Sequence, residues 1–189
     1  GRHDDGRRSA LGLLAQLLWA RRMRRVAVQV RSWLPRRGLL PRFLRSARRR
    51  QRTAAHADEY VRMRPGTDVA LIWGILWHIF ENGWEDKEFI RQRVYGMERI
   101  REEVKKYHPA EVANIVGANE EQMRRVAKLL AETKPGTIVW CMGGTQHHVG
   151  NANTRAYCIL QLALGNMGVS GGGTNIFRGH DNVQGATDM

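Results

Sequence analysis

The chain has 189 residues, which is enough for one domain with a hydrophobic core. Its formal net charge of +13 belongs to one end, because residues 1–52 hold sixteen arginines, no lysine and two aspartates. Residues 53–189 carry fifteen basic and sixteen acidic side chains, so the charge of this larger part does not indicate a nucleic-acid or anionic-membrane partner.

The arginine-rich leader, residues 1–52, has three interpretations. Its arginine clusters could form a nucleic-acid arm, but they lack interleaved aromatic side chains for stacking. The stretch GRRSALGLLAQLLWA imitates an export signal, although its apolar run is too short to span a bilayer as a helix. We favour a junction or frame artefact, because a GC-rich gene read in the wrong frame yields abundant arginine with little lysine. We therefore expect the leader to share few apolar contacts with residues 53–189.

In chain order, the first regular elements are an extended segment and a long helix. VRMRPG is typical of an extended segment that ends in a Pro-Gly turn, and Thr67 or Asp68 can then cap a helix. Two shorter helices follow in WEDKEFIRQRV and MERIREEVKKY, whose opposite-sign pairs are typical of solvated faces. His78 lies on the long helix and is expected to be a core histidine with its hydrogen bonds satisfied. The apolar side of that helix consists of Val69, Leu71, Ile72, Ile75, Leu76, Ile79 and Phe80.

Helices and a strand then alternate. Pro109 suits the first turn of a short helix, and Asn119 caps a longer one with a core stripe. Pro135-Gly136 ends that helix, and TIVWCM is expected to be a fully buried strand. The polar loop GGTQHHVGNAN and the helix TRAYCILQLALGN follow. This order predicts an α/β fold whose ligands bind at the carboxyl ends of strands.

The sequence offers no clear metal site. Cys141 and Cys158 match neither a zinc spacing nor an iron–sulfur motif, and we expect two buried free thiols. His147 and His148 are not expected to hold a metal, because adjacent side chains in a loop seldom converge.

Three polar loops remain once the core positions are removed. They are residues 64–68, residues 143–148, and the glycine run 171–173 that leads into residues 175–188. Glycines let backbone N–H groups approach phosphate oxygens, and helix N-termini add positive potential. Neither glycine-rich stretch is a GxGxxG fingerprint, and a Pro-Gly turn alone is more often only a turn. The three loops together suit a phosphorylated, nitrogen-rich ligand.

Single side chains in these loops suit such a ligand too. The carboxylate of Asp68 can accept both hydrogen bonds from the N1–H and N2–H₂ edge of a guanine. The amides of Gln146, Asn182 and Gln184 each combine donors with an acceptor, as a heterocycle requires. Arg178 is either a surface charge or a fork for a carboxylate or phosphate.

Five segments in order carry a family resemblance: RTAAHADEYVRMRPGTDVA, WHIFENGWEDKEFI, HPAEVANIVG, MGGTQHHVG and RGHDNVQGATD. From about Arg52 to Met189, the chain resembles the catalytic (alpha) subunits of molybdenum- or tungsten-dependent formate dehydrogenases. These are bis-molybdopterin guanine dinucleotide enzymes of the molybdopterin oxidoreductase family. The resemblance implies that residues 53–189 form part of the αβα dinucleotide-binding-like domains of such an enzyme, which oxidises formate to CO₂.

The resemblance also implies where the site residues lie. Gly66, Thr67 and Asp68 would lie at the guanine end of the cofactor, and Arg178 would be the catalytic residue that orients formate. The remaining implied cofactor-binding residues are Gly143, Gly144, Thr145, Gln146, Gly179, His180 and Asn182, together with Arg178 itself.

Cofactors and partners follow from the same resemblance. The implied cofactors are two molybdopterin guanine dinucleotides with molybdenum or tungsten, and a 4Fe-4S cluster whose four-cysteine motif this sequence lacks. The metal-ligating cysteine or selenocysteine is missing too, so we expect a central fragment that is inactive alone. Formate, an iron–sulfur electron-transfer subunit and a membrane cytochrome b subunit are the implied partners. RGHDN rather than RGQNN favours a periplasmic or membrane-associated complex, with a cytoplasmic location as the alternative. The alternatives are another molybdopterin enzyme, such as a nitrate reductase, and a basic nucleic-acid-binding protein acting through residues 1–52.

Overall fold

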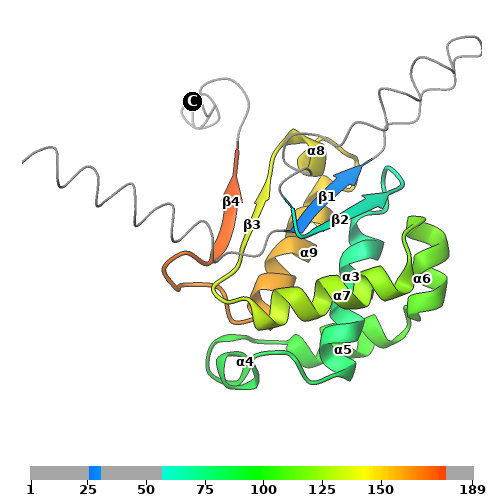
Figure 1. Cartoon of the computed structure of the whole chain (residues 1–189). Coiled ribbons are helices and arrows are strands. Elements are labelled where there is room, and N and C mark those ends of the chain that lie inside the picture. Colours follow the sequence, from blue (N-terminus) through cyan, green and yellow to red (C-terminus); the bar gives the residue numbers. More distant parts are fainter. Residues whose placement is uncertain (1–25, 31–56, 178–189) are drawn as a thin grey trace, which may run out of the picture.

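The computed structural model describes residues 26–30 and 57–177, which form two small parallel sheets and a group of helices (Figure 1). The α/β class expected from the sequence is confirmed. The strands are β1 (Val26–Val30), β2 (Glu59–Met63), β3 (Thr137–Trp140) and β4 (Gly173–Ile176). The helices are α3 (Asp68–Glu81), α4 (Lys87–Arg93), α5 (Met97–Lys105), α6 (Pro109–Val116), α7 (Glu120–Glu132), α8 (Met142–Thr145) and α9 (Gly150–Ala163).

Helix α3 lies at the centre of the helical layer, where it packs against α5, α6, α7 and α9 (Figure 1). Its expected apolar side is buried from Leu71 to Phe80, and Val69 is partly buried. Gly74 lies where α3 meets α6 and α7. A Cβ at this position would lie only 2.9 Å from Val112 Cγ1 on α6. This close crossing explains why a glycine interrupts an otherwise strongly apolar helix.

Two helix caps were predicted, and one of them has the expected contact. The Asn119 side chain caps α7, since its Oδ1 accepts a hydrogen bond from the Glu121 N–H at 2.8 Å. Thr67 does precede α3, but its hydroxyl donates instead to the Arg64 carbonyl at 2.7 Å. The predicted side-chain cap of α3 is therefore wrong, and Thr67 stabilises the preceding turn.

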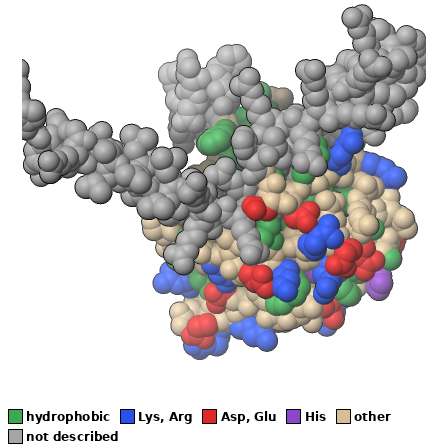
Figure 2. All heavy atoms as spheres, in the orientation of Figure 1, with side chains coloured by type: hydrophobic (Ala, Val, Ile, Leu, Met, Phe, Trp, Pro, Cys, Tyr) green, Lys and Arg blue, Asp and Glu red, His purple; other side chains and the backbone are tan. Residues whose placement is uncertain are grey.

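Helices α4 and α5 carry the solvated faces that the sequence indicates. Figure 2 shows acidic and basic side chains interspersed over the visible helical face. The exposed pairs Arg91–Glu88 on α4 and Lys106–Glu103 at the end of α5 each have 2.6 Å between nitrogen and oxygen. Exposed pairs of this kind stabilise a helix only slightly.

Strand β3 forms where expected, but the prediction that it is fully buried is wrong. Trp140 is buried, whereas Val139 is 49% exposed. Strands β3 and β4 pair in parallel, with Trp140 opposite Ile176, and α9 packs on the sheet that they form. Because successive side chains of a strand point to opposite faces, one face of β3 turns away from α9.

Strand β2 confirms the predicted extended segment, and it pairs in parallel with β1. Val28 lies opposite Val61 in this register. Strand β1 belongs to the arginine-rich leader, so backbone pairing joins these five residues to the described fold. The other residues of the leader lie outside the described part of the chain. That the leader shares few apolar contacts with residues 53–189 therefore stays a prediction.

His78 is buried in α3 as expected, with its ring 5.2 Å from that of Trp77. Its Nε2 has no hydrogen-bond partner among the described residues, so the expectation of a fully satisfied histidine is wrong. Burial lowers the pKa of His78. Cys141 and Cys158 are free thiols as predicted, but both are partly exposed rather than buried.

Within residues 57–177, no helix is both long enough and apolar enough to cross a bilayer.

Candidate functional site

Strands β3 and β4 end at the same edge of their sheet. The Phe177 N–H, directly after β4, donates to the carbonyl of Trp140, the last residue of β3, at 2.8 Å. Strand β3 leads into α8 and the residues 143–146, whereas the segment that begins at Arg178 follows Phe177. Ligands of α/β folds bind outside the carboxyl ends of strands. The structure therefore brings the second predicted loop to the edge from which the RGHDN segment departs.

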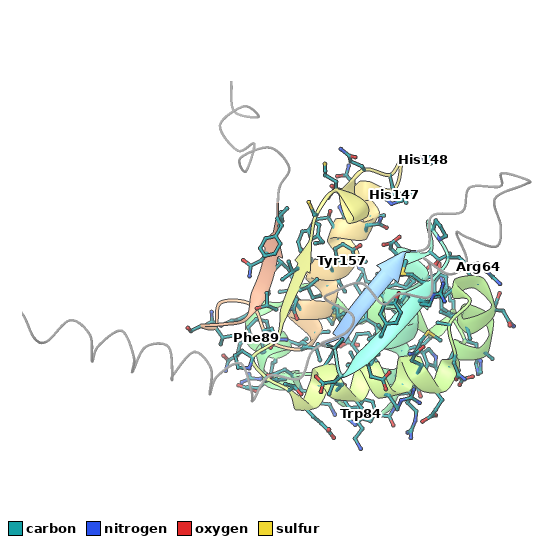
Figure 3. All side chains as sticks on the ribbon, turned by 45° about the horizontal axis from the view of Figure 1, so that its top comes forward. Arg64, Trp84, Phe89, His147, His148 and Tyr157 are labelled. Carbon is teal, nitrogen blue, oxygen red and sulfur yellow. The ribbon has the colours of Figure 1, made fainter. Side chains whose placement is uncertain are left out.

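The residues Gly143 to Gln146 form the short helical turn α8 and its end. The Gln146 N–H donates to the Met142 carbonyl at 2.8 Å, and a ring nitrogen of His147 lies 2.8 Å from the Gly143 carbonyl. Gly143, Thr145 and Gln146 are exposed, whereas Gly144 is buried. Figure 3 shows His147 and His148 beside this turn. No three His, Cys, Asp or Glu side chains among the described residues are grouped to hold a metal.

Helix α9 packs against this turn. It begins four residues earlier than the segment TRAYCILQLALGN suggested. Gly150 makes the early start possible, because a Cβ there would lie only 2.2 Å from the Thr145 carbonyl oxygen. One turn further on, the buried Asn153 side chain donates to the Gly144 carbonyl at 2.9 Å. Gly143 is different, since an added Cβ would meet no atom within 4 Å. Its backbone thus faces open space.

The first predicted loop reaches this turn through Asp68. The Tyr157 hydroxyl on α9 donates to Asp68 Oδ1 at 3.2 Å, and its ring lies 5.2 Å from that of Trp140. Asp68 is only 6% exposed, and its Oδ2 has no hydrogen-bond partner among the described residues. Burial raises the pKa of Tyr157, and the Asp68 charge acts in the same direction. The hydroxyl is therefore a protonated donor over the whole physiological pH range.

Arg64, which opens the first loop, is bound elsewhere. Its guanidinium donates to the carbonyls of Asn114 and Ile115 at the end of α6, the latter at 3.1 Å. Its backbone N–H donates to the Val116 carbonyl at 2.9 Å. Arg64 thus satisfies the last carbonyls of a helix. Gly66 is exposed, with a φ of 79° that a turn requires and open space around it.

The glycine run 171–173 lies at the opposite end of the sheet, so its expected place in the ligand loop is wrong. Gly173 begins β4 and pairs with Thr137, the first residue of β3. Its carbonyl accepts from the Gln161 side chain, which also donates to the Gly136 carbonyl at 2.8 Å. A four-residue strand, about 13 Å long, separates this end from the carboxyl edge. The run starts the strand. Arg178, Gly179, His180 and Asn182 lie outside the described residues.

Three residues at this edge were missed by the sequence reasoning: the partly buried Tyr157 and the buried Asn153 and Trp140. Trp140 Nε1 and Asn153 Oδ1, like Asp68 Oδ2, have no hydrogen-bond partner among the described residues. Gly150, Asn153 and Tyr157 are spaced i, i+3 and i+7, which places them on one face of α9. That spacing was the sequence signal that could have identified Asn153 and Tyr157. We call Asp68, Trp140, Gly144, Asn153 and Tyr157 the loop junction.

Comparisons with known proteins show which enzymes this chain is similar to. No protein-family model matches the chain. The chain is 40% identical over 141 residues to the F420-dependent formate dehydrogenase subunit alpha of Methanocaldococcus jannaschii, covering 75% of this chain and 21% of that protein. It is 36% identical over 141 residues to formate dehydrogenase H of Escherichia coli, covering 75% of this chain and 20% of that enzyme. Its identity to the formate dehydrogenase-O major subunit of the same organism is 30%, with 73% of this chain and 19% of the relative covered.

The fold has a solved counterpart. Acetylene hydratase from Pelobacter acetylenicus superimposes with a TM-score of 0.62 and 27% identity, covering 76% of this chain and 22% of that one.

These likenesses define the class: the chain shows partial homology to formate dehydrogenase alpha subunits, which are enzymes of the molybdopterin oxidoreductase family. Within it, the chain is homologous to part of the formate dehydrogenase alpha subunits and spans about a fifth of their length. The resemblance seen in the sequence is confirmed. The names "subunit alpha" and "major subunit" describe those relatives as parts of multi-subunit enzymes.

Proposed function

We propose that this chain is part of a formate dehydrogenase catalytic subunit and that its loop junction forms one side of a molybdopterin guanine dinucleotide site. The observation that carries the proposal is that Asp68 and Gly144, from two different loops, both lie beside Tyr157 in a homologue of formate dehydrogenases. When bound with molybdenum or tungsten, the cofactor supplies the two-electron oxidation of formate to CO₂. The three relatives named above favour this substrate over that of a nitrate reductase, and the near-neutral charge of residues 53–189 does not favour nucleic acid.

The residues at the edge fit a ligand with a guanine end. Asp68 Oδ2 is buried and unpaired among the described residues, and an unpaired buried carboxylate oxygen costs free energy. A guanine presents two adjacent N–H donors, which a carboxylate can accept together. Gly66 and Thr67 stand directly before Asp68, and the open space at Gly66 gives a ligand access to this turn.

The turn 143–146 fits the phosphorylated part of the same ligand. Glycine at position 143 is required neither by packing nor by a positive φ, since its neighbourhood is open and its φ is ordinary. Close approach of a ligand to the backbone is a remaining reason for glycine there. Thr145 and Gln146 are exposed beside it and supply a hydroxyl and an amide.

We place formate at Arg178, which lies outside the described residues but directly follows Phe177 at this edge. A guanidinium binds the two oxygens of a carboxylate by paired hydrogen bonds, so Arg178 would hold formate in one orientation. Gly179, His180 and Asn182 continue the same segment and would contact the cofactor.

The electron-transfer partners of the proposal are an iron–sulfur subunit and a membrane cytochrome b subunit. A 4Fe-4S cluster takes four cysteine ligands, and this chain has two cysteines. The 189-residue chain alone is therefore expected not to oxidise formate.

Nucleotide binding tests the proposed site without the complete enzyme. The 189-residue chain is titrated calorimetrically with GDP and with ADP, and GDP should bind about tenfold more tightly, because only guanine pairs with Asp68 as two donors. Asp68→Asn should remove this preference. Glu102→Gln, an exposed acid-to-amide change on α5, serves as the matched control. Equal binding of GDP and ADP by the unmodified chain would contradict the proposal.

A further inference from the structure

We propose that Tyr157 is a positioning residue that orients the Asp68 carboxylate and thereby sets the preference for guanine. The inference rests on the proposed function, and it adds a residue on a different element of the fold. Tyr157 and Asp68 are 89 positions apart in the chain, on α9 and at the start of α3.

The tyrosine ring is held on two sides. Its centroid lies 5.2 Å from that of Trp140, with the ring planes tilted by 46°. On the side of α8, a Cβ added to Gly144 would lie 3.0 Å from the Tyr157 hydroxyl oxygen and 3.1 Å from Cε2. The hydroxyl therefore has little freedom to swing away from Asp68 Oδ1.

The bond from Tyr157 leaves both carboxylate oxygens able to accept from a ligand. Oδ1 accepts from Tyr157 with one of its two lone pairs, and Oδ2 has no partner among the described residues. A planar carboxylate can accept from both N–H groups of a guanine only when its plane is correctly turned. Because burial keeps the Tyr157 hydroxyl protonated, this donor does not change near neutral pH.

Helix α9 joins the two loops through neighbouring turns of one face. Asn153 donates to the Gly144 carbonyl in the second loop, and Tyr157 donates to Asp68 in the first. Residues four apart lie above one another on a helix. One rigid helix thus fixes the distance between the two loops. A site that recognises both a base and a phosphate requires such a fixed distance.

The test compares ligands that differ in one donor. Inosine diphosphate keeps N1–H but lacks the 2-amino group of GDP, so the ratio of the two dissociation constants reports whether the carboxylate is correctly turned. The unmodified chain should prefer GDP about tenfold. Tyr157→Phe keeps the ring beside Trp140 and removes only the hydroxyl, and its ratio should fall to about two, with ADP binding changed by less than about twofold. Tyr95→Phe is the matched control, since Tyr95 is 96% exposed.

The outcomes separate the inference from the proposed function. If Tyr157→Phe weakens GDP, inosine diphosphate and ADP by the same factor, or keeps the tenfold ratio, Tyr157 only packs and the inference is overturned. If the unmodified chain does not prefer GDP over ADP, the proposed function fails and the inference fails with it. Circular dichroism checks that the variant is folded. Should Tyr157→Phe not fold, Tyr157→Met also lacks the hydroxyl, fills similar space and must give the same loss of ratio.

Discussion

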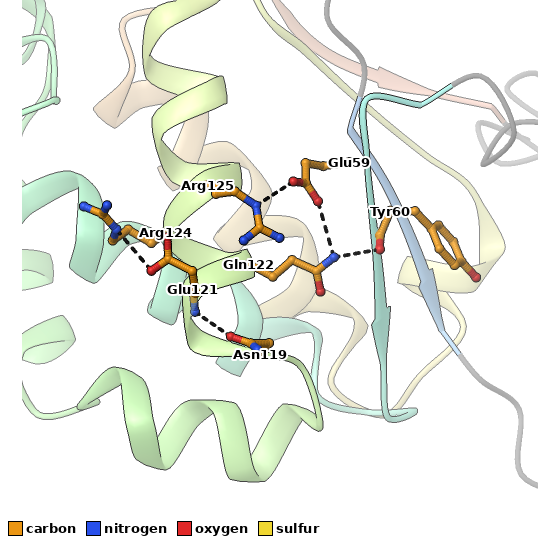
Figure 4. A network of polar contacts seen from close by, with 7 residues as sticks. All are labelled: Glu59, Tyr60, Asn119, Glu121, Gln122, Arg124 and Arg125. Carbon is orange, nitrogen blue, oxygen red and sulfur yellow. Dashed lines mark hydrogen bonds and ion pairs between the residues drawn. The ribbon is translucent and has the colours of Figure 1, made fainter.

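Arg125 on α7 and Glu59 on β2 form an ion pair with 2.7 Å between Nε and Oε1 (Figure 4). Gln122, one turn earlier on α7, donates to the Tyr60 carbonyl at 2.9 Å and lies 3.4 Å from Glu59 Oε2. These contacts hold β2 on the helical layer. Because β2 leads directly into the Asp68 loop, they also fix the place from which that loop begins.

Removing the Glu59 charge should weaken the fold slightly and in a pH-dependent way. The hydrogen bond from Arg125 lowers the pKa of Glu59 below its ordinary 4.5. The pair therefore stabilises the folded chain above that pH, and the stabilisation is lost as the pH falls below it. Since Arg125 is 51% exposed, Glu59→Gln should cost only about 0.5 kcal/mol at neutral pH.

Urea unfolding of both proteins at neutral pH and near pH 3 measures this difference, which should shrink in acid. Glu121→Gln is the control, because it breaks the exposed pair with Arg124 inside a single helix. A difference that stays constant across this pH range would show that the charge of Glu59 is not the cause.

His78 gives the fold a second pH dependence, at higher pH. Its pKa is lowered from 6.5 by burial, while Glu120 and Glu121 oppose this effect and Arg124 adds to it. The folded chain therefore takes up a proton on His78 less readily than the unfolded chain does. Stability should be complete above about pH 6.5 and should decline as the pH falls below that value.

His78→Leu should flatten the decline in unfolding free energy between about pH 7 and pH 5. The exposed His148, changed to leucine in the same way, should leave the decline as it is. An unchanged pH profile for His78→Leu would mean that another group titrates.

Two glycines beside the loop junction should respond in opposite ways to alanine. At Gly150 the new Cβ would lie 2.2 Å from the Thr145 carbonyl, so Gly150→Ala should lower the free energy of unfolding by about 1–3 kcal/mol. At Gly143 the space is open, and Gly143→Ala should leave thermal stability unchanged but weaken GDP binding. Unaltered GDP binding by Gly143→Ala would argue against ligand contact with this backbone.

The sequence predicted much of this fold from local patterns. Helical periodicity identified the buried face of α3, and Asn119 marked the start of α7 through a contact only two residues away. The exposure of Val139 was not predictable, because it depends on which elements cover a sheet and not on the strand itself. The same holds for Tyr157, whose role depends on a partner at Asp68, far away in the chain. The glycine run 171–173 was misplaced because composition alone does not tell which end of a strand a glycine occupies.

Arg178 carries the last prediction, which requires a complete formate dehydrogenase that contains this segment. If its guanidinium holds formate by two parallel N–H···O bonds, lysine cannot replace it, because an ammonium group has no planar fork. Arg178→Lys should lower kcat/KM by about 100-fold, or about 3 kcal/mol, as expected for the loss of a charged positioning contact. The metal content should be unchanged, since many other loop groups would hold so large a cofactor. Metal analysis and formate kinetics on the same preparation check both statements. Full metal content with near-normal kinetics would make Arg178 a structural residue, and joint loss of metal and activity would make it a cofactor ligand instead.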